Sequence, residues 1–175
     1  QIVSDQQAEK GNALNLTARI GKIDIPEEQQ QVEYQLDFAT DGNLLYIASA
    51  GYGKTAFLTT VLLSLAMHNR VENLNFYILD FGNRGLNPLN RLHHTADYIS
   101  FDDTERFRKF CNLIQAEIKW RKKLLAERMV QNFEVYNQVA EKTLKAIVIA
   151  IDNYDVVKEL GYEAEEFFQK LSRDG

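Results

Sequence analysis

Apolar residues along the chain follow two alternating patterns. Short continuous apolar runs are typical of strands buried on both faces of a sheet, and 146–151 is the clearest of them. Longer segments carry apolar residues three or four apart, as in an amphipathic helix. The patterns predict strands at 16–25, 32–38 (as an edge strand), from Leu44, 74–79, 98–101 and 146–151, and helices at 56–67, 104–129, 133–141 and 159–171.

This alternation predicts the fold class. Strands that alternate with helices form a mostly parallel sheet with helices on both faces, joined by right-handed crossovers. Residues 1–15 are polar and are expected to be loosely ordered, whereas 16–175 should form one α/β domain. In such sheets ligands bind at the carboxyl ends of the strands.

Composition narrows the classes of function. The 175 residues carry a net charge of −5, which argues against a chain whose main task is to grip nucleic-acid backbone. No apolar run approaches the length of a membrane span, and no signal peptide is visible. The single cysteine, Cys111, lies on an apolar helical stripe, where an inert core thiol in a reducing compartment is expected.

The strand at Leu44 runs into a small-residue loop that ends in Gly-Lys-Thr, where a helix opens. This is the layout of a phosphate-binding loop. Backbone N–H groups and the helix dipole would surround a polyphosphate, Lys54 would reach its terminal phosphates, and the Thr55 hydroxyl would bind Mg²⁺. The alternative is a glycine-rich turn with Lys54 in solvent. The predicted nucleotide contacts are Ser49, Ala50, Gly51, Tyr52, Gly53, Lys54, Thr55 and Ala56.

A second motif follows about a hundred residues later. The apolar run 146–151 ends in Asp152, the position at which such ATPases hold Mg²⁺ directly or through water. The next residue, usually a catalytic Glu, is Asn153. Since an amide cannot accept a proton as a carboxylate does, this degenerate position predicts binding without fast turnover. The alternative is that Asp152 only caps the following segment.

Other polar residues outside these motifs are candidates for a functional or a structural role. Asp80 ends a strand and would either organise water around Mg²⁺ or cap the following turn through Gly82. Arg84 could reach a neighbouring subunit's nucleotide, although simple surface exposure is favoured. His94 is expected to be a structural hydrogen-bonding group. Lys119, Arg121, Lys122 and Lys123 form a basic patch, for which a solvated helix face with Arg121 snorkelling over the core is favoured over phosphate or nucleic-acid binding.

These residues resemble a known family. The segments 20–26, 29–31 and 49–55, with 80–82, 92–97, 121–124 and 151–155 in the same order and spacing, are similar to FtsK/SpoIIIE motor ATPases. More narrowly they resemble the C-terminal ATPase modules of the EssC/EccC proteins of bacterial type VII secretion. The resemblance covers about residues 16–175 and implies a P-loop NTPase fold that binds ATP and Mg²⁺, with Thr55 and Asp152 at the metal.

The resemblance also implies partners and a location. Such modules lie on the cytoplasmic side of the bacterial cell membrane, attached to it only through the parent protein. They work with other ATPase modules of the same chain or oligomer on small helical secretion substrates, and no nucleic acid is expected.

Three departures from the family's pattern bear on activity. Ala48 and Ala50 replace a glycine and a proline of the loop, and Asn153 replaces the glutamate. Residues 171–175 resemble the stretch before a further core strand, so the domain is expected to lack its C-terminal strands. Three functions remain open at this stage: a nucleotide-binding module with weak or no hydrolysis, a pseudo-ATPase that only docks secretion partners, and an FtsK-type DNA translocase.

Overall fold

The computed structural model describes residues 14–25, 30–37, 44–48 and 54–174. Residues 1–13 and most of the predicted phosphate loop lie outside them. The elements are β1 (Thr17–Ile25), β2 (Gln30–Asp37), β3 (Leu44–Ala48), α2 (Thr55–His68), β4 (Leu74–Asp80), the 3-10 helix η1 (Asn87–Arg91), β5 (Thr95–Ser100), α3 (Thr104–Arg128), α4 (Phe133–Val139), β6 (Ala146–Asp152), the 3-10 helix η2 (Tyr154–Leu160) and α5 (Tyr162–Asp174).

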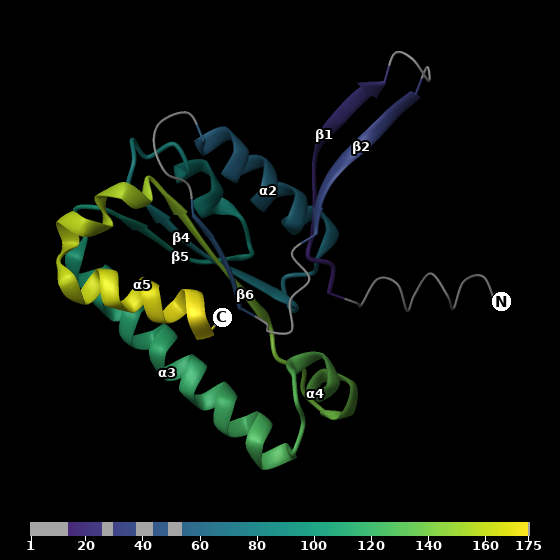
Figure 1. Ribbon diagram of the computed structural model, residues 1–175, viewed down its shortest axis with the longest axis vertical. Coiled ribbons are helices and arrows are strands. Elements are labelled where there is room, and N and C mark those ends of the chain that lie inside the picture. The colour runs from purple at the N-terminus through teal and green to yellow at the C-terminus, as the bar shows by residue number, and fades with distance from the viewer. Residues whose placement is uncertain (1–13, 26–29, 38–43, 49–53, 175) are drawn as a thin grey trace.

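The central sheet has the strand order β3-β6-β4-β5, and all its neighbouring strands are parallel. Helix α2 covers one face of this sheet, and α3 with α5 covers the other (Figure 1). The predicted α/β class, a mostly parallel sheet with helices on both faces, is therefore confirmed.

Strand β6 shows why the sheet is buried on both sides. Every one of its residues is buried. Ile147, Ile149 and Ile151 pack into the cluster that includes the apolar residues of α3 and α5. Ala146, Val148 and Ala150 alternate with them and pack into the cluster under α2. This period of two is the side-chain geometry of a strand.

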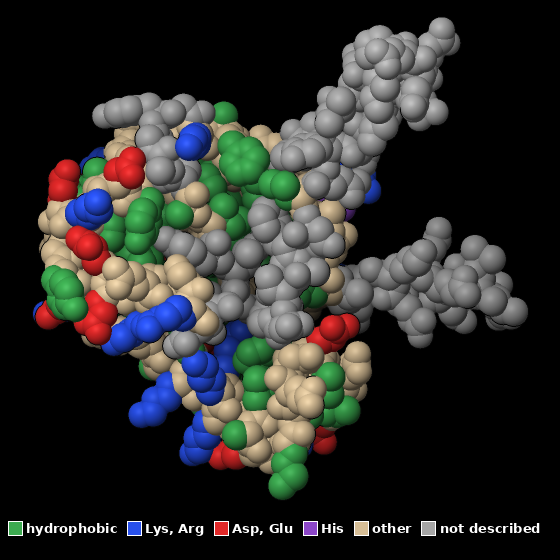
Figure 2. Space-filling view, in the orientation of Figure 1, with side chains coloured by type: hydrophobic (Ala, Val, Ile, Leu, Met, Phe, Trp, Pro, Cys, Tyr) green, Lys and Arg blue, Asp and Glu red, His purple; other side chains and the backbone are tan. Residues whose placement is uncertain are grey.

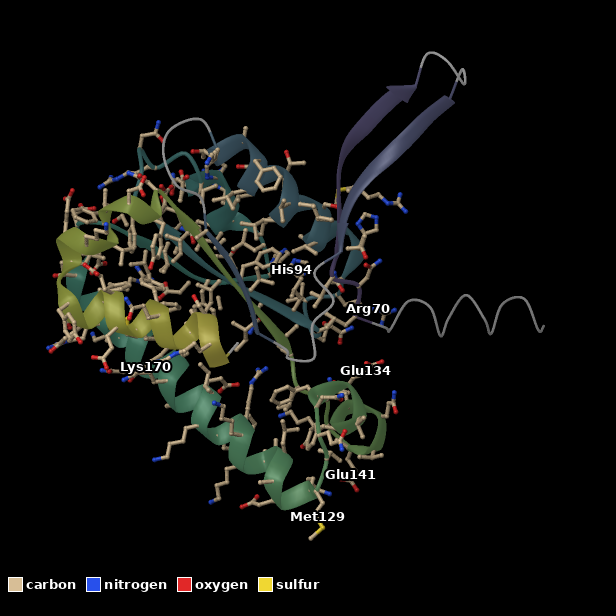
Figure 3. The ribbon with its side chains drawn as sticks, in the orientation of Figure 1. Arg70, His94, Met129, Glu134, Glu141 and Lys170 are labelled. Atoms are coloured by element: carbon tan, nitrogen blue, oxygen red, sulfur yellow. The ribbon has the colours of Figure 1, made fainter. Side chains whose placement is uncertain are left out.

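The long helix α3 agrees with its prediction, and its ends have local causes. The Asp103 side chain accepts a hydrogen bond from the backbone N–H of Arg106 at 3.0 Å, which caps the N-terminus. Met129 ends the helix in the left-handed conformation (φ 54°), and its side chain projects from the end of α3 (Figure 3).

Among the predicted boundaries and pairings that differ from the structure, the following bear on the architecture. Strand β5 begins at Thr95 rather than at residue 98. Helix α5 begins at Tyr162 rather than at 159, because residues 154–160 form η2 and Gly161, at φ 100°, separates the two helices. Strand β2 pairs antiparallel with β1 in a separate hairpin, which protrudes from the domain beside α2 (Figure 1), and does not join the edge of the main sheet.

Side chains of α2 hold the base of this hairpin. The backbone N–H of Arg19 donates to the Ser64 hydroxyl at 2.8 Å, and Ala18 is fully buried in the core under α2. The hairpin is therefore attached to the domain through the residues at the start of β1.

Among the described helices, none combines the length and the apolar content that a membrane crossing requires.

Candidate nucleotide and metal site

Three parallel strands bring the predicted site residues together at the carboxyl-terminal end of the sheet. Asp80 ends β4 and Asp152 ends β6, and the two residues are paired in register. Strand β3 lies on the other side of β6, with Ala48 paired to Ile151. Because parallel strands end at the same edge, both aspartates and the start of α2 belong to one region, as the strand order predicted.

Thr55 and Asp152, ninety-seven residues apart, are in direct contact. The Thr55 hydroxyl donates to Asp152 Oδ2 at 2.6 Å. Asp152 is 3% exposed, whereas Thr55 is partly exposed at the first position of α2. The structure thus joins the two residues that were predicted to hold Mg²⁺, as an oxygen pair at the end of a buried strand.

The N-terminus of α2 is not capped by its own residues. Lys54 at the N-cap position makes no side-chain capping hydrogen bond, and the first turn contains no acidic residue. The first backbone N–H groups of a helix have no partner within the helix, and the helix dipole adds a partial positive charge there. Lys54 and Ala56 are both exposed at this end. The predicted contacts Ser49, Ala50, Gly51, Tyr52 and Gly53 lie outside the described residues.

The loop from Phe81 to Leu86 packs against the Thr55–Asp152 pair through two glycines. A Cβ atom on Gly85 would lie 2.6 Å from Thr55 Cγ2, and one on Gly82 would lie 3.1 Å from Asp152 Oδ2. The first distance is too short for any side chain without a shift of Thr55. Glycine at position 85 therefore permits the loop to touch Thr55, a role that the sequence reasoning missed. The signal was a pair of glycines three residues apart, just after a strand that ends in Asp.

Asp80 fixes the far end of this loop. It is 1% exposed, and its Oδ2 accepts hydrogen bonds from the Leu86 backbone N–H and the Tyr98 hydroxyl, both at 2.8 Å. Its Oδ1 has no hydrogen-bond partner among the described residues. Burial, followed by the hydrogen bond to Asp80, raises the pKa of Tyr98. Of the two predicted roles, the structure shows loop capping, although the partner is Leu86 and not Gly82.

Asn153 has a left-handed backbone, at φ 59° and ψ 59°. Asn is among the few residues other than Gly that adopt this conformation readily. The local backbone therefore gives a physical reason for Asn, rather than Glu, directly after Asp152.

Other predicted polar residues have structural partners away from this edge. His94 is buried, its Nε2 lies 2.8 Å from the Asn69 carbonyl oxygen, and its ring stacks on Phe76 beneath α2 (Figure 3). This agrees with the predicted structural role. Burial raises the pKa of the half-buried Cys111 thiol to about 12, so the thiolate is disfavoured at neutral pH, as expected for an inert thiol.

The prediction for Arg121 is wrong in one respect. Its side chain does not snorkel but is buried, and Nε donates to Glu117 at 2.7 Å while Nη2 donates to the Lys145 carbonyl at 2.8 Å. Its guanidinium also lies over the Phe133 ring. The lysines of the patch, Lys119, Lys122 and Lys123, are exposed, and Figure 2 shows Lys and Arg side chains along the lower part of the molecule, over α3. Arg121 therefore ties α3 to the start of β6.

A groove of about 350 Å³ lies between α3 and α5, away from the strand ends. Ile118, Phe167 and Leu171 form its apolar part, and three lysines lie at its rim. Its lining contains no carboxylate–hydroxyl pair of the kind formed by Asp152 and Thr55. The candidate nucleotide and metal site therefore remains at the carboxyl-terminal ends of the strands.

Comparisons with known proteins agree with this geometry. The FtsK/SpoIIIE family matches residues 6–167. The ESX secretion system protein EccC of Geobacillus thermodenitrificans is 41% identical over 156 residues, which is 89% of this chain and 10% of that protein. The chain thus spans about a tenth of the length of this relative.

Two solved structures extend the match to the fold. EssC (ATPases 2 and 3) from Geobacillus thermodenitrificans is 40% identical with a TM-score of 0.79, covering 94% of this chain and 32% of that chain. A structure described as the cytoplasmic domain of EssC is 38% identical with a TM-score of 0.77, covering 91% and 30% respectively. The fold is that of an EssC/EccC ATPase domain, and the chain belongs to the FtsK/SpoIIIE family.

Proposed function

We propose that this chain is a nucleotide-binding module of a type VII secretion ATPase, which binds ATP with Mg²⁺ and hydrolyses it slowly or not at all. The observation that carries the proposal is the 2.6 Å hydrogen bond between Thr55 and Asp152 at the start of α2. A hydroxyl and a carboxylate are the hard oxygen ligands that Mg²⁺ prefers. The described residues therefore fit the metal.

The same region suits a polyphosphate. The backbone N–H groups at the start of α2 and the exposed Lys54 would face its negative charge. The glycine contacts at positions 82 and 85 keep side chains of the neighbouring loop off Thr55 and Asp152. When bound, Mg²⁺ would neutralise charge on the phosphates. Lys54, Thr55, Ala56 and the loop residues 49–53 remain the proposed nucleotide contacts.

Asn153 supports the proposal of slow hydrolysis. In this position an amide can orient a water molecule but cannot remove its proton. The left-handed backbone also disfavours the glutamate that would act as the base. We therefore propose that the module works through binding, as a regulatory or docking part of the parent ATPase, on the cytoplasmic side of the membrane and beside other modules, with small helical proteins as its secretion substrates.

Calorimetric titration with Mg·ATP tests the proposal. Saturable binding to the wild-type domain, abolished in Lys54→Ala, is the expected result. Lys122→Ala is the matched control, because Lys122 is exposed on α3, away from the strand ends. No binding up to millimolar ATP would defeat the proposal and would favour the pseudo-ATPase alternative.

A further inference from the structure

The loop that packs on Thr55 and Asp152 also carries a cation, Arg84. Arg84 lies between the two glycines of this loop and has a positive φ of 63°. Left-handed backbone at a residue with a Cβ costs free energy, and such strain persists where the surrounding structure enforces it, often at functional sites. The backbone at Arg84 is therefore held in place rather than relaxed.

The neighbours of Arg84 place it beside the site of its own chain. Gly82, two residues earlier, lies against the Asp152 carboxylate, and Gly85, the next residue, lies against the Thr55 methyl group. Asp80 fixes the loop end by binding the Leu86 N–H. The backbone of Arg84 therefore lies near the start of α2 of its own chain, while its side chain is directed to Asp102.

The present partner of Arg84 is weakly held. Its Nη2 lies 3.1 Å from Asp102 Oδ2 and 3.3 Å from Oδ1, and the two side chains are 66% and 70% exposed. An exposed pair of this kind contributes little free energy, because water and salt screen it. A phosphate group offers the same fork of oxygens with more negative charge, and guanidinium–phosphate pairs are among the stronger hydrogen-bonded contacts.

We propose that Arg84 binds the terminal phosphate of a nucleoside triphosphate in its own chain, and that Asp102 competes for the guanidinium when no triphosphate is bound. The inference rests on the proposed nucleotide binding and deepens it. It makes Arg84 the residue that distinguishes a triphosphate from a diphosphate, since a diphosphate lacks the group that displaces Asp102. This role differs from an arginine finger supplied to a neighbouring subunit.

The test compares the dissociation constants of Mg·ATP and Mg·ADP, measured by calorimetry on the same protein samples. Arg84→Ala is expected to reduce the preference for ATP over ADP by about 10-fold, with ADP binding unchanged. Arg84→Gly should reduce the preference to the same extent while raising Tm of the nucleotide-free protein, because glycine relieves the positive φ. Asp102→Asn should strengthen ATP binding by about threefold, the effect of freeing Arg84 from an exposed pair.

Arg91→Ala is the matched control, because Arg91 is an exposed arginine at the end of η1. It should leave both dissociation constants unchanged. An unchanged ATP preference in Arg84→Ala and Arg84→Gly would overturn the inference, as would an equal loss of ATP and ADP affinity, which indicates only general attraction. Absence of binding in the wild type defeats the proposed function and this inference together. Intact wild-type binding with an unchanged preference in the variants defeats the inference alone.

Discussion

Asp80 and Asp152 occupy equivalent positions on neighbouring parallel strands, yet their surroundings differ. Both are buried, at 1% and 3% exposed, and they are paired in register at the same edge of the sheet. Asp80 accepts hydrogen bonds from a backbone N–H and a phenol, both fixed in the loop and in β5. Asp152 accepts a hydrogen bond from the Thr55 hydroxyl at the start of α2. The register of the parallel strands brings both carboxylates to the same end of the sheet. Their different partners give Asp80 a structural role and leave Asp152 as the proposed ligand-binding residue.

The largest expected effect on stability concerns Asp80. Asp80→Ala leaves the Leu86 N–H and the Tyr98 hydroxyl without their acceptor, so we expect a loss of about 3 kcal/mol in the free energy of unfolding. Asp152→Ala removes the acceptor of the partly exposed Thr55 hydroxyl, which water can replace, and should cost about 1 kcal/mol. Urea unfolding of both variants measures the difference. Equal losses would contradict the division of roles.

Removal of the Thr55 hydroxyl should weaken ATP binding in the presence of Mg²⁺ and leave ATP binding without Mg²⁺ unchanged. Thr55→Val keeps the shape of the side chain but removes the hydroxyl that lies on Asp152. We expect ATP affinity in the presence of Mg²⁺ to fall about 10-fold, or ~1.4 kcal/mol, with no change when EDTA is present. Thr59→Val is the control, because the Thr59 hydroxyl donates to backbone within α2, at the Thr55 carbonyl. A loss in EDTA as large as that in Mg²⁺ would contradict a metal role.

Substitutions of Asn153 test whether the left-handed backbone at this position disfavours glutamate. Asn153→Glu should lower the free energy of unfolding by about 1 kcal/mol relative to Asn153→Gly, because glycine, unlike glutamate, adopts the left-handed conformation without strain. Thermal unfolding of the two variants gives the comparison, and a phosphate-release assay on Asn153→Glu should show no gain in turnover. Equal stability of Glu and Gly at this position would show that the backbone does not select the residue.

Tyr98 should give the smallest effect. Tyr98→Phe removes one hydrogen bond to Asp80 and should cost about 1 kcal/mol or less at neutral pH. The pKa of Tyr98 is raised above the ordinary tyrosine value of 10.0, mainly by burial and then by Asp80. The contribution of the neutral phenol is thus complete below about pH 10 and declines as pH rises above it. The wild type should lose stability above pH 10 more steeply than Tyr98→Phe, and parallel curves would contradict the coupling.

The sequence predicted the fold better than it predicted the details of the site. Apolar runs identified β6 and β4, because strands that are buried on both faces of a sheet carry apolar residues at successive positions. The start of α5 was missed because a 3-10 helix and Gly161 intervene, which apolar spacing does not reveal. Arg121 was misread because its partners, the Lys145 carbonyl and Phe133, are brought to it only by the tertiary fold.

The same limit applies at the strand ends. Thr55 and Asp152 could be predicted as a pair, because each belongs to a motif with a known layout. The contact of Gly85 with Thr55 and the bond of Asp80 to Tyr98 depend on how one loop packs across the edge, and no local pattern encodes that packing.

The most direct test of the account is a pair of Mg·ATP titrations on Asp152→Asn and Asp80→Asn, two changes of equal size at register-matched buried positions. Asp152→Asn should lose ATP affinity by about 100-fold or more in Mg²⁺, because an amide is a poor substitute for a carboxylate at a divalent metal. Asp80→Asn should bind as the wild type does. Equal affinity of the two variants, whether both retained or both lost, would contradict the assignment of ligand binding to Asp152 and of loop anchoring to Asp80.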